Sequence, residues 1–430
     1  MTNNNENKVL NVPTKREQCQ TCLSIAERAE LRPKGNVPNL RFPEFTGEWK
    51  VERLDEIATL SKGIGISKEQ LSNNGEPCIL YGELYTKYKS EIIKEIDSRT
   101  NIDNSKLKRS KANDVIIPCS GETAIDIATA RCVPFDNILL GGDLNIISLY
   151  QYDGAFMSYQ LNGKRKYDIA KVAQGVSVVH LYGEHLKAII TYTPCLQEQQ
   201  KIAKLLSLLD ERIATQNKII DKLQSLISGI IQNAIQKGLN DNTWEMIYLS
   251  KLLTERKEKN SNGYEVNSVS VSEGIINQIE YLGRSFAASD TSKYNVVRYG
   301  DIVYTKSPTG NFPYGIIKQS FQKHPVAVSP LYGVYEPYSN EAGCFLHYYF
   351  LSSIVTTNYL SPLIQKGAKN TINISNQTFL NNMVPYPKEE VGIRPIAALL
   401  RNVQIKLNIE KLSLVLLEQQ KTYLLRSMFI

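Results

Sequence analysis

The feature of this sequence that most restricts its fold is a long stretch from about Gln199 to Ile235, in which apolar residues recur every three or four positions. The polar Gln216 is the one interruption. A 3.5-residue period predicts a helix with a narrow apolar seam, which a second long helix must bury. Gly238 and the polar residues 240–242 predict the end of this helix. The seam positions are Leu206, Leu209, Ile213, Ile220, Leu223, Ile227 and Ile230.

The partner helix is expected at the C-terminal end of the same chain. Adding 194 to the seam positions leads to a second apolar set, and the polar Gln216 falls on the polar Glu410. Only Ile227, which falls on Lys421, breaks the match. Two amphipathic helices can be aligned by chance, so other repeated segments must support the match. The second seam comprises Leu400, Val403, Leu407, Leu414, Leu417 and Leu424.

Segments outside the helices repeat at nearly the same spacing, with offsets between 187 and 195. Loop insertions in duplicated domains produce such a drift. We therefore predict an α+β (mixed α/β) fold: two similar globular α/β domains separated by two long antiparallel coiled-coil helices, in a pseudo-twofold internal duplication. The repeated pairs are 49–57 with 244–252, 113–116 with 300–303, and 175–194 with 367–387.

The predicted domain organisation follows from this repeat. Within the first domain, Val115–Ile117 and Asn145–Leu149 have the composition of strands, Gly141–Gly142 marks a turn, and Phe156–Leu161 is more helical. The segments are a flexible N-terminal segment 1–38, a first globular domain 39–195, a central helical region 196–240, a second globular domain 241–388, and a C-terminal helical region 389–430.

Composition restricts the class of protein. The chain has 430 residues, a net charge of +7 and 42% hydrophobic residues, which is ordinary for a globular protein of two to three domains. We find no run of eighteen apolar residues and no apolar signal region, so neither a membrane span nor secretion is expected. Seven cysteines at irregular spacing favour the reducing cytoplasm.

The excess of basic residues fits a nucleic-acid partner without establishing one. Basic clusters occur at 106–111, 164–166 and 256–259. Each cluster taken alone is more often a solvated face than a phosphate site.

A search for catalytic motifs finds none. Gly63-Ile64-Gly65 lacks the third glycine of a dinucleotide fingerprint, and a P-loop sequence is absent. Cys119 and Ser120 lack a partner base in the sequence. Catalytic residues are therefore predicted to be none.

A metal site is not predicted either. The pair Cys19 and Cys22 supplies two ligands, whereas structural zinc needs four. The histidines at 180, 185, 324 and 347 have no metal-binding spacing. Asp114 and Asp301 precede equivalent strands, where a turn-capping role is expected.

Several motifs together resemble the specificity subunit of Type I restriction–modification enzymes. They are the duplicated plan, the segment VPNLRFPEFTGEW at 37–49, the pair NDVII/GDIVY, and the helix start PCLQEQQKIAKLLSLLDERI at 194–213. The second copy departs from this helix start, because it reads EEVGIRPIA at 389–397. The resemblance covers residues 39–430.

The resemblance implies a non-catalytic subunit. Each globular domain would be a target recognition domain that reads one half of a split site in double-stranded DNA, and the helices would set the spacing. Two modification (methyltransferase) subunits would bind S-adenosylmethionine and methylate adenine at N6, and restriction subunits would add ATP- and Mg-dependent translocation and cleavage. No cofactor is expected in this chain, and the setting would be cytoplasmic phage defence.

DNA contacts are expected in polar, glycine-rich loops that carry lysines, because such loops can approach phosphates and base edges. Lys62 and Lys68 flank the glycine loop at 63–65, and Lys366 and Lys369 flank Gly367. The candidate DNA-binding residues are Lys62, Lys68, Ser120, Lys164, Arg165, Lys306, Ser307, Lys366 and Lys369.

Two alternatives stay open at this point. One is a stand-alone DNA-binding protein, for which helix-turn-helix spacing would be expected and is not found. The other is a coiled-coil scaffold that joins two protein-binding domains and has no affinity for DNA.

Overall fold

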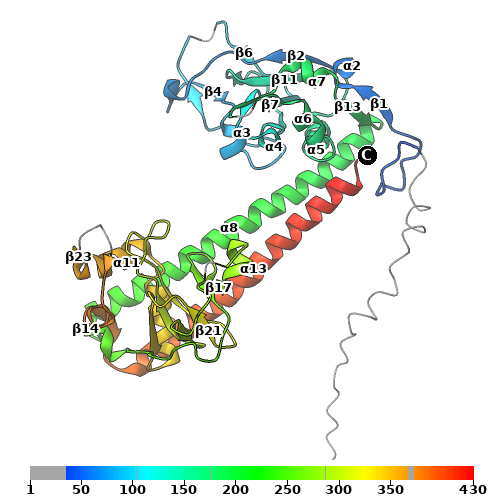
Figure 1. Cartoon of the computed structure of the whole chain (residues 1–430). Helices are drawn as coiled ribbons and strands as arrows, with labels where there is room; N and C mark the ends of the chain where they lie inside the picture. Colours follow the sequence, from blue (N-terminus) through cyan, green and yellow to red (C-terminus); the bar gives the residue numbers. More distant parts are fainter. Residues whose placement is uncertain (1–34, 104, 176, 286, 367–371) are drawn as a thin grey trace, which may run out of the picture. The chain divides into compact units, whose positions relative to one another are not determined.

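The computed structural model describes residues 35–103, 105–175, 177–285, 287–366 and 372–430. The chain divides into two compact units (Figure 1). Unit 1 comprises Met1–Ala214 and Val415–Ile430, and unit 2 comprises Thr215–Leu414. Cys19, Cys22 and most of the expected N-terminal segment lie outside the described residues.

Two long helices connect to both units: α8 (Leu196–Asn240) and α13 (Arg394–Ser427). The division into units falls inside both helices, because each half of a helix packs on the globule next to it. In unit 1 the start of α8 shares an apolar cluster with the end of α13. In unit 2 the end of α8 shares one with the start of α13. The two helices are therefore antiparallel, and the predicted fold class is confirmed.

The seam positions of the two helices face apolar neighbours. Within the described residues, no helix combines the length and the hydropathy needed to cross a bilayer. Both helices are instead apolar on one side only, which suits a pair that buries a narrow seam. Leu206, Leu209, Ile220, Leu400, Val403 and Leu407 are buried, and Ile213, Leu223, Leu414 and Leu417 are half-buried.

The remaining elements of unit 1 are short. The strands are β1 (Lys50–Arg53), β2 (Ala58–Lys62), β3 (Leu71–Ser72), β4 (Glu76–Ile79), β5 (Arg99–Thr100), β6 (Lys108–Arg109), β7 (Asp114–Pro118), β8 (Ser120–Gly121), β9 (Arg131–Val133), β10 (Leu139–Leu140), β11 (Leu144–Leu149), β12 (Val179–His180) and β13 (Ile190–Thr193). The helices are α2 (Leu54–Ile57), η2 (Lys68–Gln70), α3 (Glu83–Thr86), α4 (Ala124–Ile127), α5 (Gly154–Asn162), α6 (Lys166–Val172) and α7 (Gly183–Lys187).

The centre of unit 1 is a four-stranded antiparallel sheet in the order β2-β11-β7-β9. Both of its faces are covered, which explains the uninterrupted apolar run in β7. Val115 and Ile117 belong to the cluster that includes α5, while Ile116 faces a second cluster with strands β4 and β10. The strands predicted at 115–117 and 145–149 and the helix at 156–161 are confirmed.

Unit 2 contains a second set of elements. The strands are β14 (Trp244–Tyr248), β15 (Leu253–Glu255), β16 (Asn267–Ser270), β17 (Gly274–Asn277), β18 (Asn295–Val297), β19 (Ile302–Tyr304), β20 (Ile317–Gln319), β21 (Val326–Val328), β22 (Gly333–Pro337), β23 (Gln365–Lys366), β24 (Ile372–Asn373) and β25 (Met383–Pro387). The helices are η3 (Leu249–Lys251), α9 (Gln278–Leu282), α10 (Asn340–Tyr349), α11 (Ser353–Leu360), η4 (Ser361–Leu363), α12 (Asn376–Leu380) and η5 (Glu390–Ile393).

The central sheet of unit 2 repeats that of unit 1 strand for strand. Its order is β15-β22-β19-β20, and every neighbouring pair is again antiparallel. Each unit also has a two-stranded sheet next to a long helix, β1-β13 in unit 1 and β14-β25 in unit 2. The internal duplication predicted from the drifting offsets is thus present in the topology.

The turns before β7 and β19 are equivalent in detail. The Asp114 carboxylate accepts a hydrogen bond from the Lys111 backbone N at 2.9 Å, and the Asp301 carboxylate accepts one from the Arg298 backbone N at 2.8 Å. Each aspartate follows a residue in the left-handed region, Asn113 at φ 81° and Gly300 at φ 90°. The expected turn-capping role of both aspartates is confirmed.

α8 ends at Asn240, within the polar residues that predicted its end, and Gly238 lies in its last turn. Its role is to allow close packing. A Cβ at position 238 would lie 2.0 Å from Cδ1 of Trp244, whose ring is buried. The glycine therefore makes room for the indole that begins the second globule.

We predict that Gly238→Ala destabilises the chain by about 1–3 kcal/mol, because the new methyl group must displace a buried ring. Gly229→Ala is the matched control, since it lies in the same helix and its Cβ would meet nothing within 4 Å. The control should gain up to ~1 kcal/mol from helix propensity. Urea unfolding measures both, and equal effects of the two substitutions would contradict this account of Gly238.

Candidate nucleic-acid interface

Four loops of unit 1 come together beside the central sheet, at residues 62–65, 119–121, 141–143 and 180–182. Backbone hydrogen bonds hold them: Gly63 N donates to Leu144 O at 2.9 Å, and Leu181 N donates to Cys119 O at 2.9 Å. A Cβ on Gly63 would lie 1.9 Å from Gly141 O, so the approach of these two loops requires glycine.

The side chains on these loops form a group that we call the polar loop cluster: Lys62, Ser120, Asp143, His180 and Tyr182. Ser120 Oγ lies 3.3 Å from His180 Nδ1 and 3.5 Å from an Asp143 carboxylate oxygen. Lys62 Nζ lies 5.6 Å from the centre of the Tyr182 ring, and Tyr182 stacks on His180 with ring centres 6.2 Å apart.

The polar loop cluster has the chemistry of a nucleic-acid contact. Lys62, Asp143, His180 and Tyr182 are exposed. A lysine suits a phosphate, whereas hydroxyl, carboxylate and imidazole groups supply donors and acceptors for base edges. Of the predicted DNA-binding residues, the structure places Lys62 and Ser120 together here. Sequence reasoning missed Asp143, His180 and Tyr182 as members of this group.

Ser120 therefore has a histidine neighbour, which the sequence had not indicated. The arrangement still differs from a nucleophile–base–carboxylate relay, because Asp143 contacts the serine and not the imidazole. Burial raises the pKa of the adjacent Cys119 thiol to about 11, which keeps that thiol protonated and unreactive near neutral pH.

Lys306, one of the predicted contacts in unit 2, is engaged inside its own unit. Its Nζ donates to Asn376 Oδ1 at 2.6 Å, and Asn376 in turn donates to Glu255 at 2.6 Å. Burial lowers the pKa of Lys306. Its ammonium is therefore part of the internal structure of unit 2, while the neighbouring Ser307 is exposed.

The other candidates are scattered. Arg165 donates to Ile430 O at 3.1 Å and lies 3.3 Å from Asp168, so it holds the end of the chain inside unit 1. Lys164 is half-buried beside it, and Lys68 is exposed at the start of η2. Lys366 lies in β23, and Lys369 lies outside the described residues.

The most specific sequence motif, at the start of α8, has a structural role. The Arg41 guanidinium donates to both carboxylate oxygens of Glu198, each at 2.7 Å, and the Glu198 side chain is fully buried. Gln199 accepts from Asp153 N at 2.9 Å and donates to Pro194 O at 2.8 Å. Two motifs that are 157 positions apart thus form one contact, which we call the clasp (Arg41–Glu198).

Lys201 extends the same contact. Its Nζ lies 4.5 Å from the centre of the Phe42 ring and pairs with Glu44. The helix start of α13 differs, since it carries Pro395 and lacks the glutamate–glutamine pair in its first turn. The clasp therefore belongs to unit 1 and to the first copy of the repeat.

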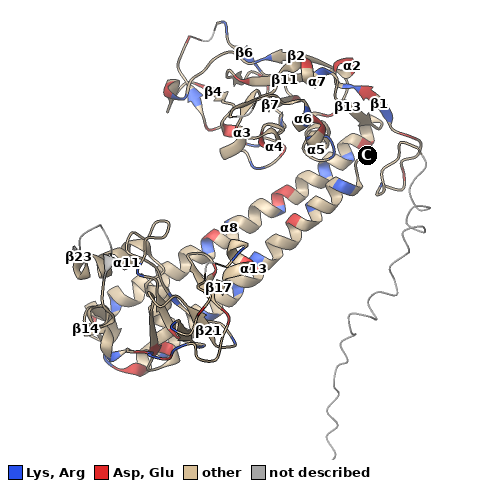
Figure 2. Ribbon diagram, viewed as in Figure 1, with Lys and Arg blue, Asp and Glu red and all other residues tan. Residues whose placement is uncertain are grey.

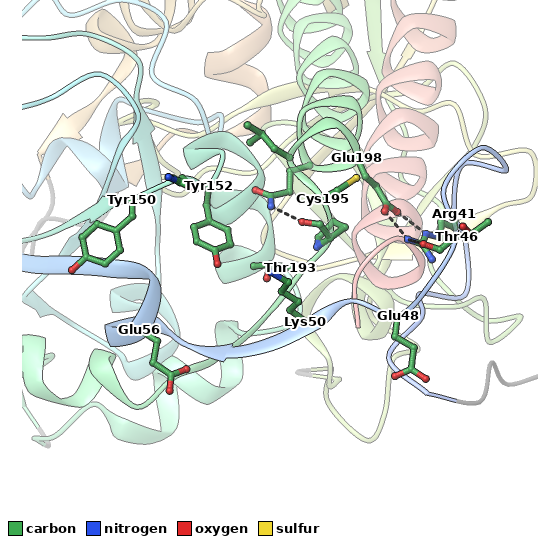
Figure 3. A pocket seen from close by; sticks show the side chains of 14 residues that line it. Arg41, Thr46, Glu48, Lys50, Glu56, Tyr150, Tyr152, Thr193, Cys195 and Glu198 are labelled. Atoms are coloured by element: carbon green, nitrogen blue, oxygen red, sulfur yellow. Dashed lines mark hydrogen bonds and ion pairs between the residues drawn. The ribbon is translucent and has the colours of Figure 1, made fainter.

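The clasp borders a cavity of about 540 Å³ at the start of α8 (Figure 3). Figure 3 shows Tyr150 and Tyr152 on the opposite side of it from Arg41. Charges of both signs line the cavity, among them Lys50 and Glu56.

Within the described residues, no group of His, Cys, Asp and Glu could hold a metal ion. Figure 2 likewise shows acidic and basic residues interspersed along both long helices.

Comparison with known proteins finds a family match for part of the chain. Residues 46–225 match the family described as the Type I restriction modification DNA specificity domain. Residues 46–225 thus resemble this DNA specificity domain, and the resemblance that the sequence motifs indicate is confirmed. The match extends from the first globule into α8.

One solved structure shows a similar fold. The crystal structure of the S subunit of a Type-I restriction-modification system from M. genitalium is 16% identical, with 92% of this chain and 99% of that chain covered and a TM-score of 0.60. The HsdS subunit from Thermoanaerobacter tengcongensis is 14% identical, with 89% and 96% covered and a TM-score of 0.40. A chain from a structural study of type I R-M complex assembly is also 14% identical, with 90% and 98% covered and a TM-score of 0.47.

We predict that Glu198→Gln or Arg41→Met lowers the free energy of unfolding by about 3 kcal/mol, because either change leaves a buried charge without its partner. Arg53→Met is the control, since the ion pair of Arg53 with Asp55 is exposed and its loss should change stability little. Urea unfolding of the full chain is the measurement. Equal stability of all three variants would show that the clasp is dispensable.

Proposed function

We propose that this chain is the DNA-recognition subunit of a Type I restriction–modification complex, in which each globular domain reads one half of a bipartite DNA site. The observation that carries the proposal is the match of residues 46–225 to a DNA specificity domain. The polar loop cluster supports it, because exposed donors and acceptors converge there on loops held by the sheet beneath them.

The role of the second globule rests on the duplication. Its central sheet has the same strand order as that of unit 1, and the aspartate turn before the equivalent strand is kept. A duplicated fold with different loops is suited to reading two different half-sites. Lys306 is committed to Asn376, so the contacts of unit 2 are expected from exposed neighbours such as Ser307.

The remaining parts of the complex are proposed on the family resemblance. The two long helices would set the spacing of the half-sites and dock two modification subunits, and restriction subunits would join them. S-adenosylmethionine, ATP and Mg would bind to those partners, and this chain would contribute recognition without catalysis. The setting would be the cytoplasm. A scaffold without DNA affinity is the rival function, and the following experiments separate the two.

We predict that Lys62→Ala weakens DNA binding by the assembled complex and reduces the slope of log affinity against log salt by about one, as the loss of one phosphate contact requires. Affinity measured at several salt concentrations tests this. Lys171→Ala is the matched control, because Lys171 is exposed on α6 and lies outside the polar loop cluster. A complex that binds no DNA would favour the scaffold.

His180→Ala should act differently from Lys62→Ala. Because imidazole can contact a base edge, its loss should relax the sequence preference within one half-site and leave the other half-site unchanged. Methylome sequencing of cells that carry the variant reads both half-sites at once. Relaxation of both half-sites would contradict independent reading by the two domains.

The spacing role can be tested by inserting seven residues into each helix, after Ile213 and after Leu407. A heptad preserves the seam register and adds roughly 10 Å, or about three base pairs. The recognised spacer should lengthen while both half-sites stay the same. Three base pairs also rotate the second half-site, so the informative result is the motif of the residual methylation. An unchanged spacer would show that these helices do not set the distance.

A further inference from the structure

A buried group of charged side chains joins the first globule to the ends of both long helices. Lys421 of α13 places its Nζ 2.6 Å from a Glu91 carboxylate oxygen and 2.6 Å from an Asp210 carboxylate oxygen. Asp210 also accepts hydrogen bonds from Ser90 Oγ at 2.9 Å and from Tyr159 Oη at 2.7 Å. We call these five residues the charged joint.

The Lys421 ammonium contacts both carboxylates of this group directly, and the buried Arg131 adds a weaker attraction. Glu91 and Asp210 are each 7% exposed, so both carboxylates are removed from water. Burial raises the pKa of Glu91, and the attraction of Lys421 offsets only part of that rise. Burial alone would lower the pKa of Lys421, but the two carboxylates outweigh it and raise that pKa. Without the lysine, two carboxylates would stay buried with the weaker attraction of Arg131 as compensation.

The second repeat contains a neutral version of the same joint. Asp210 corresponds to Gln404 at the 194-residue offset, and Lys421 corresponds to Ile227. In unit 2, Tyr348 on α10 donates to Gln404 at 3.4 Å, as Tyr159 on α5 donates to Asp210. Ile227 is buried in the apolar core of unit 2.

The comparison indicates that the charges of the joint are not required to hold a globule on the helix pair. In unit 2 the globule is held on the helix pair by apolar packing, the tyrosine–glutamine contact and a partly exposed ion pair between Arg401 and Glu341, so a buried charged group is unnecessary for that purpose. Replacing buried ion pairs with apolar groups is often neutral for stability. The best-supported use of a buried polar group is to select one partner or register over another.

A competing partner exists because the helices are repeats. The end of α8 in a second copy of the chain carries Leu223 and Ile230 where α13 carries Leu417 and Leu424. Its seam would therefore fit the start of α8. Ile227 would then take the place of Lys421, and Glu91 and Asp210 would face a side chain without charge.

We propose that the charged joint is a pairing selector, which lets the first globule accept the end of α13 and reject the repeat-equivalent end of α8 from another molecule. The chain thereby closes on itself instead of exchanging helices between copies. This inference does not depend on DNA recognition.

The selector is tested with two variants of the full chain. Lys421→Ile alone leaves both carboxylates without the lysine and should lower the melting temperature by roughly 10 °C. The triple variant Glu91→Gln, Asp210→Gln, Lys421→Ile removes the charges of the joint. It should recover most of that loss, because the nearby Arg131 keeps its hydrogen bonds to the backbone carbonyls of Tyr88, Ala130 and Leu84. Lys411→Ile, an exposed position on the same helix, is the control and should melt like the parent chain.

The decisive measurement is the oligomeric state after unfolding and refolding at increasing concentration, by light scattering on a sizing column. The parent chain should return as monomer, whereas the triple variant should form dimers at a several-fold higher fraction. Three results would overturn the selector: a Lys421→Ile variant that melts like the parent, a folded triple variant that is as monomeric as the parent, or a triple variant that no longer folds. The last would show that the charges are needed for docking itself.

Discussion

The packing of the chain's last residues against the start of α8 is the interaction on which unit 1 depends. Met428 and Phe429 are buried in a cluster with Trp49 and Leu206, and Leu40 N donates to Ser427 O at 2.9 Å. The first strand, the first long helix and the last helix therefore share one core. Because a narrow seam is stable only when it is covered, the end of α13 is as necessary to the first globule as any of that globule's own strands.

Because the two units are repeats, the way in which each globule packs on the long helices can be compared. The four central strands, their order and the aspartate turn are common to both units. The contacts between globule and helices differ. Unit 1 uses the clasp at the start of α8 and the charged joint at Asp210, whereas unit 2 buries Ile227 and pairs Tyr348 with Gln404. The shared elements define the fold, whereas the buried charged contacts of unit 1 make the two ends of the helix pair chemically different.

In the proposed function, the polar loop cluster would contact DNA through side chains that the sheet holds in place. Its side chains come from loops whose backbones are tied to buried strands, as in the bond from Asn145 Nδ2 to Leu181 O at 2.9 Å. Exposed groups on a rigid base lose little conformational entropy when they bind. Replacing loop residues changes what is recognised and leaves the core intact, which is the property a recognition domain needs.

The sequence by itself determined the helices, the duplication and the fold class, because these rest on local periodicity and on offsets that can be read along the chain. It also indicated Lys62 and Ser120 through their glycine-rich loops. It did not indicate that His180 lies beside Ser120, that Arg41 pairs with Glu198, or why Lys421 breaks the second seam. The partners in these contacts are far apart in the sequence. They are separated by 60 positions for Ser120 and His180, by 157 for Arg41 and Glu198, and by 211 and 330 for the two carboxylates of Lys421. Only tertiary structure decides them, because a side chain's partner depends on which elements pack together, and no local pattern records that choice.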